Sequence, residues 1–429
     1  MNFKPTKYSL VCCANGHRFE DDGWTLADPT CTIPSLVRAE YENEAYVPQE
    51  HLEGLYRYSC WLPVTRMLKG SANPVTFKSI ALAQELGLEN LYITFSGWWP
   101  EKGARMHTCS FKETEAYSVC GRLAADDRRI LVVASAGNTA RAFAKVCSDN
   151  YIPLLLSIPE DNISALWFER PLNDCVKIIA SPKGSDYFDA ITLSEKVCTD
   201  SSFLAEGGAK NVARRDGMGT TLLSAIEVIG SIPHAYFQAV GSGTGAIAVW
   251  ENNLRLIKDG RYGSHKMRLY PSQNVPFTIM YDSWKQNSRL LVDMTPEDAR
   301  TAAAEIDAKV LSNRKPPYAL AGGVFDAMKD AGGDMFKVTN EELRFWKKRF
   351  EELEGIDIHD APAVAVASLA AAVKEGAVKK DETIMLNITG GGEKLAKSQH
   401  EIFYAKPHLV LDPALSTEEI ISEVKKLYQ

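Results

Sequence analysis

Two lysines occur in settings where an amine could act as a nucleophile or a general base. Lys78 lies in NPVTFKSIALAQELG and Lys112 lies in HTCSFKETEAYSVC, and each follows a phenylalanine at the expected start of a helix. A lysine amine becomes reactive when its surroundings lower its pKa. Most lysines are solvated surface charges, so neither residue alone identifies a catalytic site.

A glycine-rich loop, GSGTG at 241–245, separates an expected strand from an expected helix. Glycines let backbone N–H groups approach a phosphate, and the N-terminus of the next helix adds partial positive charge. The loop lacks the Gly-Lys-Ser/Thr ending of a nucleotide P-loop, and its G-x-G-x-G spacing fits the dinucleotide fingerprint poorly. Taken alone, it indicates either a phosphate cradle or a simple tight turn.

The pattern of apolar residues predicts the elements that hold these groups. From about residue 125, short apolar runs alternate with helical patterns, which predicts a mostly parallel α/β architecture with helices on both faces. Ligands bind beyond the carboxyl ends of the strands in such folds, so the loops of interest are SAGNTA, GSGTG and TGGG. The expected strands are 130–135, 152–159, 176–181, 235–240 and 383–388, and the expected helices include 187–198, 219–230 and a final helix capped by Ser416 and Glu419.

The order of these elements favours Lys112 over Lys78. One helix and one strand separate Lys112 from Asn138. Because consecutive elements are usually neighbours, we expect the two residues on adjacent loops at the same edge of the sheet. We expect Lys78 in a helical region upstream of the site.

The S-F-K of Lys112 at a helix start, followed by S-x-G-N-T, GSGTG and a late TGGG, resembles the pyridoxal-phosphate (PLP) enzymes of the threonine synthase group. The resemblance covers almost the whole chain. It implies a tryptophan synthase β-like fold of two open, mostly parallel sheets with helices on both faces. It also implies that Lys112 forms a Schiff base with PLP and that Asn138 contacts the ring oxygen. The remaining implied contacts are a phosphate cradle made by Gly241, Ser242, Gly243, Thr244 and Gly245, and Thr389 at the pyridine nitrogen.

The same resemblance implies three units. Residues 1–45 are expected to form a degenerate zinc-ribbon-like cap, residues 46–125 and 226–429 the large PLP-binding domain, and residues 126–225 a small α/β domain. The cap contains Cys12, Cys13, His17 and Cys31, but no intact Cys-x-x-Cys knuckle. We therefore expect no bound metal, and metal analysis is the direct test of a zinc-binding module.

The flanks of Lys112 bear on the substrate. Threonine synthases usually place Asp-Arg-Gly after the lysine, whereas here Glu-Thr-Glu follows. Together with SAGNTARAFA, EGGAKNVARRDGMGT and LNITGGGEK, this chain is similar to the branch that makes L-cysteate from O-phospho-L-serine and sulfite in coenzyme M biosynthesis. The alternatives are a threonine synthase acting on O-phosphohomoserine and, from another class, a catalytically silent PLP-fold regulator.

Anionic substrates require donors and positive charge. The loop with Ser135, Gly137 and Thr139 leads into a helix, whose N–H groups could bind the substrate carboxylate. We expect Trp98 and Trp99 to serve packing rather than binding. The basic candidates for phosphate or sulfite are Lys102, Arg105, His107, Lys210, Arg214 and Arg215.

The bulk properties exclude some classes of protein. A net charge of −7 over 429 residues argues against a broad nucleic-acid surface. We find no apolar run long enough for a membrane span and no signal-peptide layout. The odd count of nine cysteines is typical of reduced thiols in the cytoplasm. The expected partners are small-molecule substrates and, as is usual for the fold, further copies of the chain in a homo-oligomer.

Overall fold

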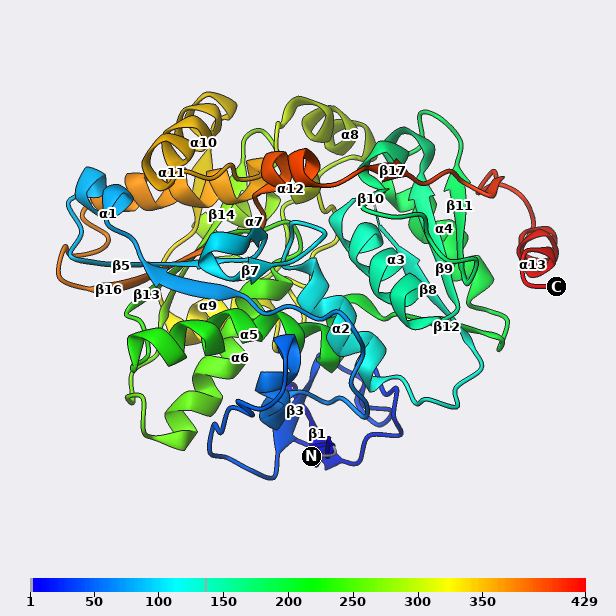
Figure 1. The fold of residues 1–429 in the computed structure, drawn as a ribbon, viewed down its shortest axis with the longest axis horizontal. Helices are drawn as coiled ribbons and strands as arrows, with labels where there is room; N and C mark the ends of the chain where they lie inside the picture. The colour runs from blue at the N-terminus through cyan, green and yellow to red at the C-terminus, as the bar shows by residue number, and fades with distance from the viewer. Residues whose placement is uncertain (1–2, 136) are drawn as a thin grey trace.

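The short apolar runs form the strands of two open sheets (Figure 1), in a computed structural model that describes residues 3–135 and 137–429. The larger sheet has the strand order β15-β14-β13-β16-β5-β4. All its strands are parallel except the edge strand β4, which runs antiparallel to β5. Its members are β4 (Val75–Lys78), β5 (Asn90–Phe95), β13 (Ala235–Ala239), β14 (Arg268–Asn274), β15 (Phe336–Val338) and β16 (Thr383–Ile388).

The smaller sheet is entirely parallel and has the order β12-β8-β9-β11-β18. Two of its inner strands, β9 and β11, are buried at every position, as expected for strands covered on both faces. The members are β8 (Ile130–Ala134), β9 (Leu154–Pro159), β11 (Val176–Ser181), β12 (Phe203–Ala205) and β18 (Leu409–Val410).

Helices cover both faces of the larger sheet (Figure 1). One face packs against α11, which is backed by α10 and α1, and the opposite face packs against α5, α6 and α9. The helix α5 is buried along most of its length because it lies between the sheet, α2 and α6. The bounds are α1 (Ala81–Leu86), α5 (Val212–Ile229), α6 (Thr244–Asp259), α9 (Val324–Ala331), α10 (Asn340–Glu354) and α11 (Asp360–Lys374).

The smaller sheet separates its side chains by the two-residue period of a strand. Leu131 and Val133 of β8 belong to the core shared with α3, whereas Val132 packs with α4 and the C-terminal α13. The bounds are α2 (Lys112–Arg122), α3 (Asn138–Asn150), α4 (Tyr187–Val197) and α13 (Thr417–Lys426).

The N-terminal residues form a small antiparallel sheet with the order β2-β1-β3, which packs at the base of the body (Figure 1). Shorter elements connect the larger layers. Their bounds are β1 (Tyr8–Cys12), β2 (Arg18–Phe19), β3 (Val37–Tyr41), β6 (Trp98–Trp99), β7 (Ala104–Arg105), β10 (Trp167–Phe168), β17 (Phe403–Tyr404), α7 (Ile279–Lys285), α8 (Pro296–Glu305), α12 (Glu393–Gln399), and the 3-10 turns η1 (Gly54–Trp61), η2 (Pro100–Lys102), η3 (Glu160–Ala165), η4 (Gly208–Lys210) and η5 (Lys309–Leu311).

The predicted fold class is confirmed, and the strand at 383–388 and the capping box of Ser416 and Glu419 form as expected. Two placements differ from the expected domain boundaries. The helix α5 lies on the larger sheet, and β18 with α13 returns the C-terminal segment to the smaller one. Lys78 was wrongly expected in a helix: it ends the edge strand β4 and is exposed. None of the helices in the described ranges is long and apolar enough to cross a lipid bilayer.

Candidate active site

Lys112 is held against the carboxyl end of β16 in the larger sheet. The Phe111 N–H donates to the Thr389 carbonyl at 3.0 Å, and the Gly391 N–H donates to the Cys109 carbonyl at 3.1 Å. These bonds join the segment before α2 to the loop after β16. Cys109 has a φ of 52°, a left-handed conformation that is costly for a residue with a side chain. Backbone strain of this kind is concentrated at functional sites.

The glycine loop lies beside this point because β13 pairs with β16. Gly243 has a φ of 76°, and a side chain there would strike Val324. A Cβ at Gly245 would lie 2.7 Å from the Gln238 side chain, so the loop has no room for substituents. The first amides of α6 have no partners within the helix, as at any helix N-terminus. The loop therefore fits a phosphate group approached by backbone N–H donors.

Asn138 begins α3 and follows β8, so it lies at an edge of the smaller sheet. The expectation that Lys112 and Asn138 share one sheet edge is wrong, because their loops belong to different sheets. The loops nevertheless converge. A Cβ at Gly137 would lie 3.7 Å from a methyl of Val310, and one at Gly241 would lie 2.8 Å from the Val310 carbonyl. The site is thus formed between the two sheets.

A buried carboxylate connects the two sides. Glu115, one turn after Lys112 on α2, lies 3.1 Å from the Lys112 amine and accepts a 2.9 Å hydrogen bond from the Thr139 hydroxyl. Arg214 of α5 lies 3.4 Å from the same carboxylate and is also paired with Glu206 at 2.6 Å. These five side chains form one polar network at the junction of α2, α3 and α5.

The network sets the ionisation of the lysine. Burial lowers the pKa of Lys112, and nearby Arg214 acts in the same direction, while Glu115 opposes them. Burial alone would raise the pKa of Glu115, but Arg214 and Lys112 outweigh it and hold that pKa below its usual range. A lysine amine with a lowered pKa can act as a nucleophile toward an aldehyde or as a base.

A second bridge between the loops is Arg141, one turn into α3. Its guanidinium donates to the Thr108 carbonyl at 2.9 and 3.3 Å and to the Asn138 carboxamide oxygen at 3.0 Å. The Asn138 amide nitrogen has no hydrogen-bond acceptor among the described residues, so it remains available as a donor. Neither Arg141 nor Glu115 was predicted as a site residue. The signal in the sequence was their position, each three residues after a predicted site residue and therefore on the same helix face.

The predicted substrate-binding residues have different surroundings. The Ser135 hydroxyl accepts from the Gly137 N–H at 3.2 Å, and the Thr139 hydroxyl is engaged by Glu115. His107 is paired with Glu169 at 2.8 Å and lies against Trp98. Arg105 and Lys210 are exposed. Arg214 alone among the basic candidates joins the Lys112 network.

Three further candidates lie outside this network. Lys102 is exposed, near the rings of Phe77 and Trp99. Arg215 is fully buried and paired with Glu251 at 2.9 Å. Trp98 and Trp99 are buried in apolar clusters, in agreement with a packing role.

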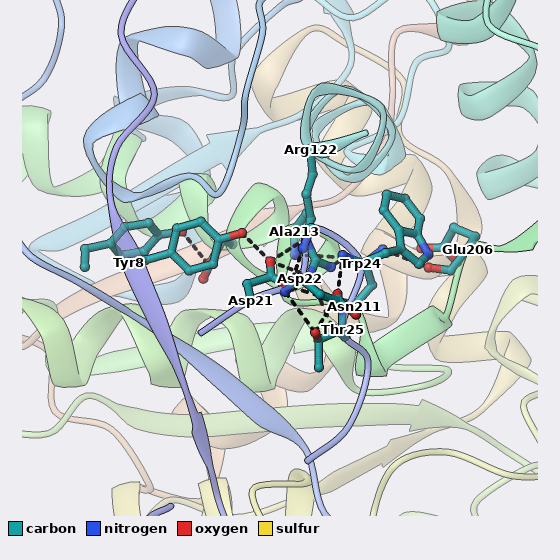
Figure 2. Close-up of polar contacts among 12 residues, drawn as sticks. Tyr8, Asp21, Asp22, Trp24, Thr25, Arg122, Glu206, Asn211 and Ala213 are labelled. Atoms are coloured by element: carbon teal, nitrogen blue, oxygen red, sulfur yellow. Dashed lines mark hydrogen bonds and ion pairs between the residues drawn. The ribbon is translucent and has the colours of Figure 1, made fainter. Parts of the chain in front are cut away.

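The N-terminal cap is tied to the back of this network (Figure 2). Arg122, at the end of α2, forms a buried ion pair with Asp21 at 2.7 Å and donates to the Asn211 side chain at 2.9 Å. Asn211 caps α5 and donates to the Glu206 carbonyl at 2.8 Å. The Trp24 indole N–H donates to the Ala205 carbonyl at 3.0 Å. The cap thereby packs on the segment that carries Glu206 and Arg214.

The cysteines and histidine of the cap do not converge. His17 is hydrogen-bonded to Asp28 at 2.9 Å, and the Cys12 sulfur lies 3.4 Å from the Ser35 hydroxyl. In the parts of the chain that the structure describes, no group of three or more His, Cys, Asp or Glu side chains is arranged to hold a metal ion.

Three features of the site fit PLP: the Lys112 amine of lowered pKa, a glycine loop at a helix N-terminus, and the Asn138 amide donor. The fold agrees. Maize serine racemase aligns with a TM-score of 0.57 at 15% identity, covering 76% of this chain and 92% of its own. Threonine deaminase isoform 2 from Solanum lycopersicum aligns with a TM-score of 0.54 at 19% identity, covering 76% and 87%. Residues 101–390 match the model of the pyridoxal-phosphate dependent enzymes, and the chain belongs to that family.

Relatives with higher identity narrow the class. The cysteate synthase of Methanosarcina acetivorans is 46% identical over 417 residues, covering 96% of this chain and 99% of its own. Those of Methanosarcina barkeri and Methanocella paludicola are 45% and 44% identical, over 90% and 97% of this chain and 93% and 97% of theirs. Within the PLP-dependent enzymes, the chain belongs with the cysteate synthases.

Proposed function

We propose that this protein replaces the phosphate of O-phospho-L-serine with sulfite, giving L-cysteate and phosphate. The observation that carries the proposal is the 43–46% identity to cysteate synthases over nearly the whole chain. In the reaction, the Cβ–O bond to phosphate breaks, and phosphate leaves with the electron pair. A C–S bond then forms from the sulfur lone pair of sulfite, so no oxidant or reductant is needed.

We assign the cofactor contacts to the residues that the sequence pattern predicts. Lys112 would hold the cofactor through its aldehyde, the Asn138 amide would donate to the ring oxygen, and the Thr389 hydroxyl would contact the ring nitrogen. The backbone amides of Gly241, Ser242, Gly243, Thr244 and Gly245 would hold its phosphate. When bound, PLP serves as an electron sink for the negative charge that develops at Cα.

The protein then manages protons and charge. Lys112 would take the Cα proton of the substrate on its Nζ and later return it. Glu115, 3.1 Å from that nitrogen, stabilises the ammonium form between these steps. The amides at Gly137 and Thr139, at the start of α3, bind the substrate carboxylate. Arg214, Lys210, Arg105 and His107 remain candidates for holding phosphate or sulfite.

The test is product identification. Purified protein with PLP should release phosphate from O-phospho-L-serine and form L-cysteate when sulfite is added, whereas Lys112→Ala should not. Threonine formation from O-phosphohomoserine, without cysteate formation, would replace the proposal with threonine synthase activity. Absence of any PLP absorbance band in the wild type would favour a silent regulator.

We also propose that the protein acts in the cytoplasm. All nine cysteines are free thiols in the structure, which supports a reducing compartment such as the cytoplasm. The homo-oligomer stays a prediction, testable by light scattering.

A further inference from the structure

Arg141 is a buried cation in direct contact with the loop that precedes Lys112 and with Asn138 at the start of α3. The residue as a whole is only 3% exposed. Besides the bonds to Thr108 and Asn138, it donates to the Ala165 carbonyl at 3.0 Å, and its guanidinium lies 4.5 Å from the Trp167 ring centre. Every polar neighbour within hydrogen-bonding distance is therefore a neutral oxygen.

The absence of a direct ion pair sets Arg141 apart. No carboxylate lies within ion-pair distance of it in the described ranges. Burial lowers its pKa, and Glu393 and Glu113, which attract it from beyond ion-pair distance, offset this only in part. Keeping an unpaired charge away from water is costly, so its retention calls for an explanation beyond packing. The other deeply placed arginines are paired: Arg122 with Asp21, Arg214 with Glu206, Arg215 with Glu251 and Arg255 with Asp216.

The bond to Asn138 has a direction that matters. An asparagine carboxamide can present either its oxygen or its NH₂ group to a ligand, since the two ends have nearly the same shape. Arginine has donors only, so it can bind only the oxygen end. With its oxygen held at 3.0 Å by Arg141, Asn138 directs its NH₂ group elsewhere, as a donor.

We propose that Arg141 is a positioning residue that fixes Asn138 as a hydrogen-bond donor to the ring oxygen of PLP and ties Asn138 to the loop that precedes Lys112. The inference rests on the proposed cofactor contacts of Asn138 and Lys112. It accounts for the fork geometry, because one guanidinium reaches the Thr108 carbonyl on the Lys112 side and Asn138 on the other. It also accounts for the absence of a direct ion pair, since a nearby positive charge favours the ionised form of the ring oxygen.

The experiment compares PLP binding by the apoprotein of the wild type with that of Arg141→Met and Arg141→Lys, using the cofactor absorbance spectrum. Arg141→Met removes the charge and the donors, so we expect PLP affinity to fall roughly tenfold, the loss expected for one charge-assisted hydrogen bond. We also expect the visible band of the ionised ring to lose intensity to the near-ultraviolet band. Arg141→Lys keeps the charge without the fork, so the band should largely persist while affinity still falls.

Two controls separate positioning from folding. Trp167→Phe keeps an aromatic face beside the guanidinium and breaks none of its hydrogen bonds, so its PLP spectrum should match the wild type. In an Asn138→Ala background, Arg141→Met should add little further loss of affinity, because the residue acts through Asn138. Thermal unfolding of each variant shows whether it folds. If Arg141→Met does not fold, the PLP affinity of Arg141→Lys becomes the test of the positioning role.

The outcomes distinguish the two proposals. If the wild type forms no band with PLP, the proposed function fails. If the wild type forms the band and folded Arg141 variants bind PLP with unchanged affinity and spectrum, only the positioning role is overturned. The positioning role would also be overturned if Arg141→Met lowered PLP affinity as much in the Asn138→Ala background as in the wild type, because the two residues would then act independently.

Discussion

The Thr139 hydroxyl donates a 2.9 Å hydrogen bond to the Glu115 carboxylate, joining α3 of the smaller sheet to α2, which begins at Lys112. Arg141 makes a parallel connection from Asn138 to Thr108. The loop before Lys112 and the loop before Asn138 therefore belong to separate sheets. Buried polar contacts, and not a common sheet edge, align them. Buried polar contacts that are satisfied on both sides can hold two loops in one arrangement.

The first prediction concerns the choice between the two lysines. Lys112→Ala should abolish the covalent PLP band and lower turnover about 10²- to 10⁴-fold, because it removes both the bonding amine and the proton carrier. Lys78→Ala should leave both unchanged, since its amine is exposed and bonded to Asn90 at 3.1 Å. Absorbance after incubation with PLP is the measurement. A normal band in Lys112→Ala would contradict the assignment.

The second prediction is a pH dependence set by Glu115. The carboxylate raises the pKa of Lys112 against the opposing effect of burial, so Glu115→Gln should lower that pKa further. Only the neutral amine attacks an aldehyde, and the neutral fraction grows above the pKa. The rise in the rate of PLP attachment with pH should therefore have its midpoint at lower pH in Glu115→Gln.

Stopped-flow absorbance of the apoprotein mixed with PLP, across a series of buffers, measures this midpoint. Glu206→Gln is the matched comparison: Glu206 pairs with Arg214 and also raises the pKa of Lys112, but less than Glu115 does, so its midpoint should shift in the same direction by less. An unchanged midpoint in Glu115→Gln, or a shift toward higher pH, would refute the electrostatic role.

Much of this arrangement was predictable from local sequence. Short apolar runs such as TIMLNI favour a strand covered on both faces, and β16 has the predicted bounds. The assignment of Lys112 and Asn138 to one sheet failed because alternating strands and helices predict parallel pairing without saying which strands share a sheet. Lys78 was misplaced because VTFK forms an edge strand of only four residues. A pattern this short indicates a strand no more strongly than it indicates the start of a helix. Arg141 was missed because its significance lies in its burial without a direct ion pair, and only the fold reveals both properties.

The third prediction tests the phosphate cradle. Gly243 has a φ of 76°, and a side chain there would collide with Val324, so Gly243→Ala should destabilise the protein and weaken PLP binding. Gly230 is the matched control: it has a φ of 78° at the end of α5, with nothing within 4 Å of an added Cβ. Both variants should lose about 1–2 kcal/mol of stability from left-handed backbone strain. Only Gly243→Ala should lose affinity in a PLP titration, and equal affinities would contradict the cradle.

The last prediction concerns the N-terminal cap. Arg122 is fully buried and its only carboxylate partner in the described structure is Asp21, itself 6% exposed (Figure 2). Asp21→Asn should therefore lower the free energy of unfolding by about 3–5 kcal/mol, because it leaves a buried guanidinium without its counter-ion. Glu40→Gln, which breaks the exposed pair with Arg18 in the same cap, should cost no more than about 1 kcal/mol. Urea unfolding of both variants measures the difference.

Adding Arg122→Met to Asp21→Asn should recover part of the lost stability, because the buried, unpaired guanidinium charge is then removed. If Asp21→Asn unfolds at the same urea concentration as Glu40→Gln, the cap does not stabilise α2 through this pair.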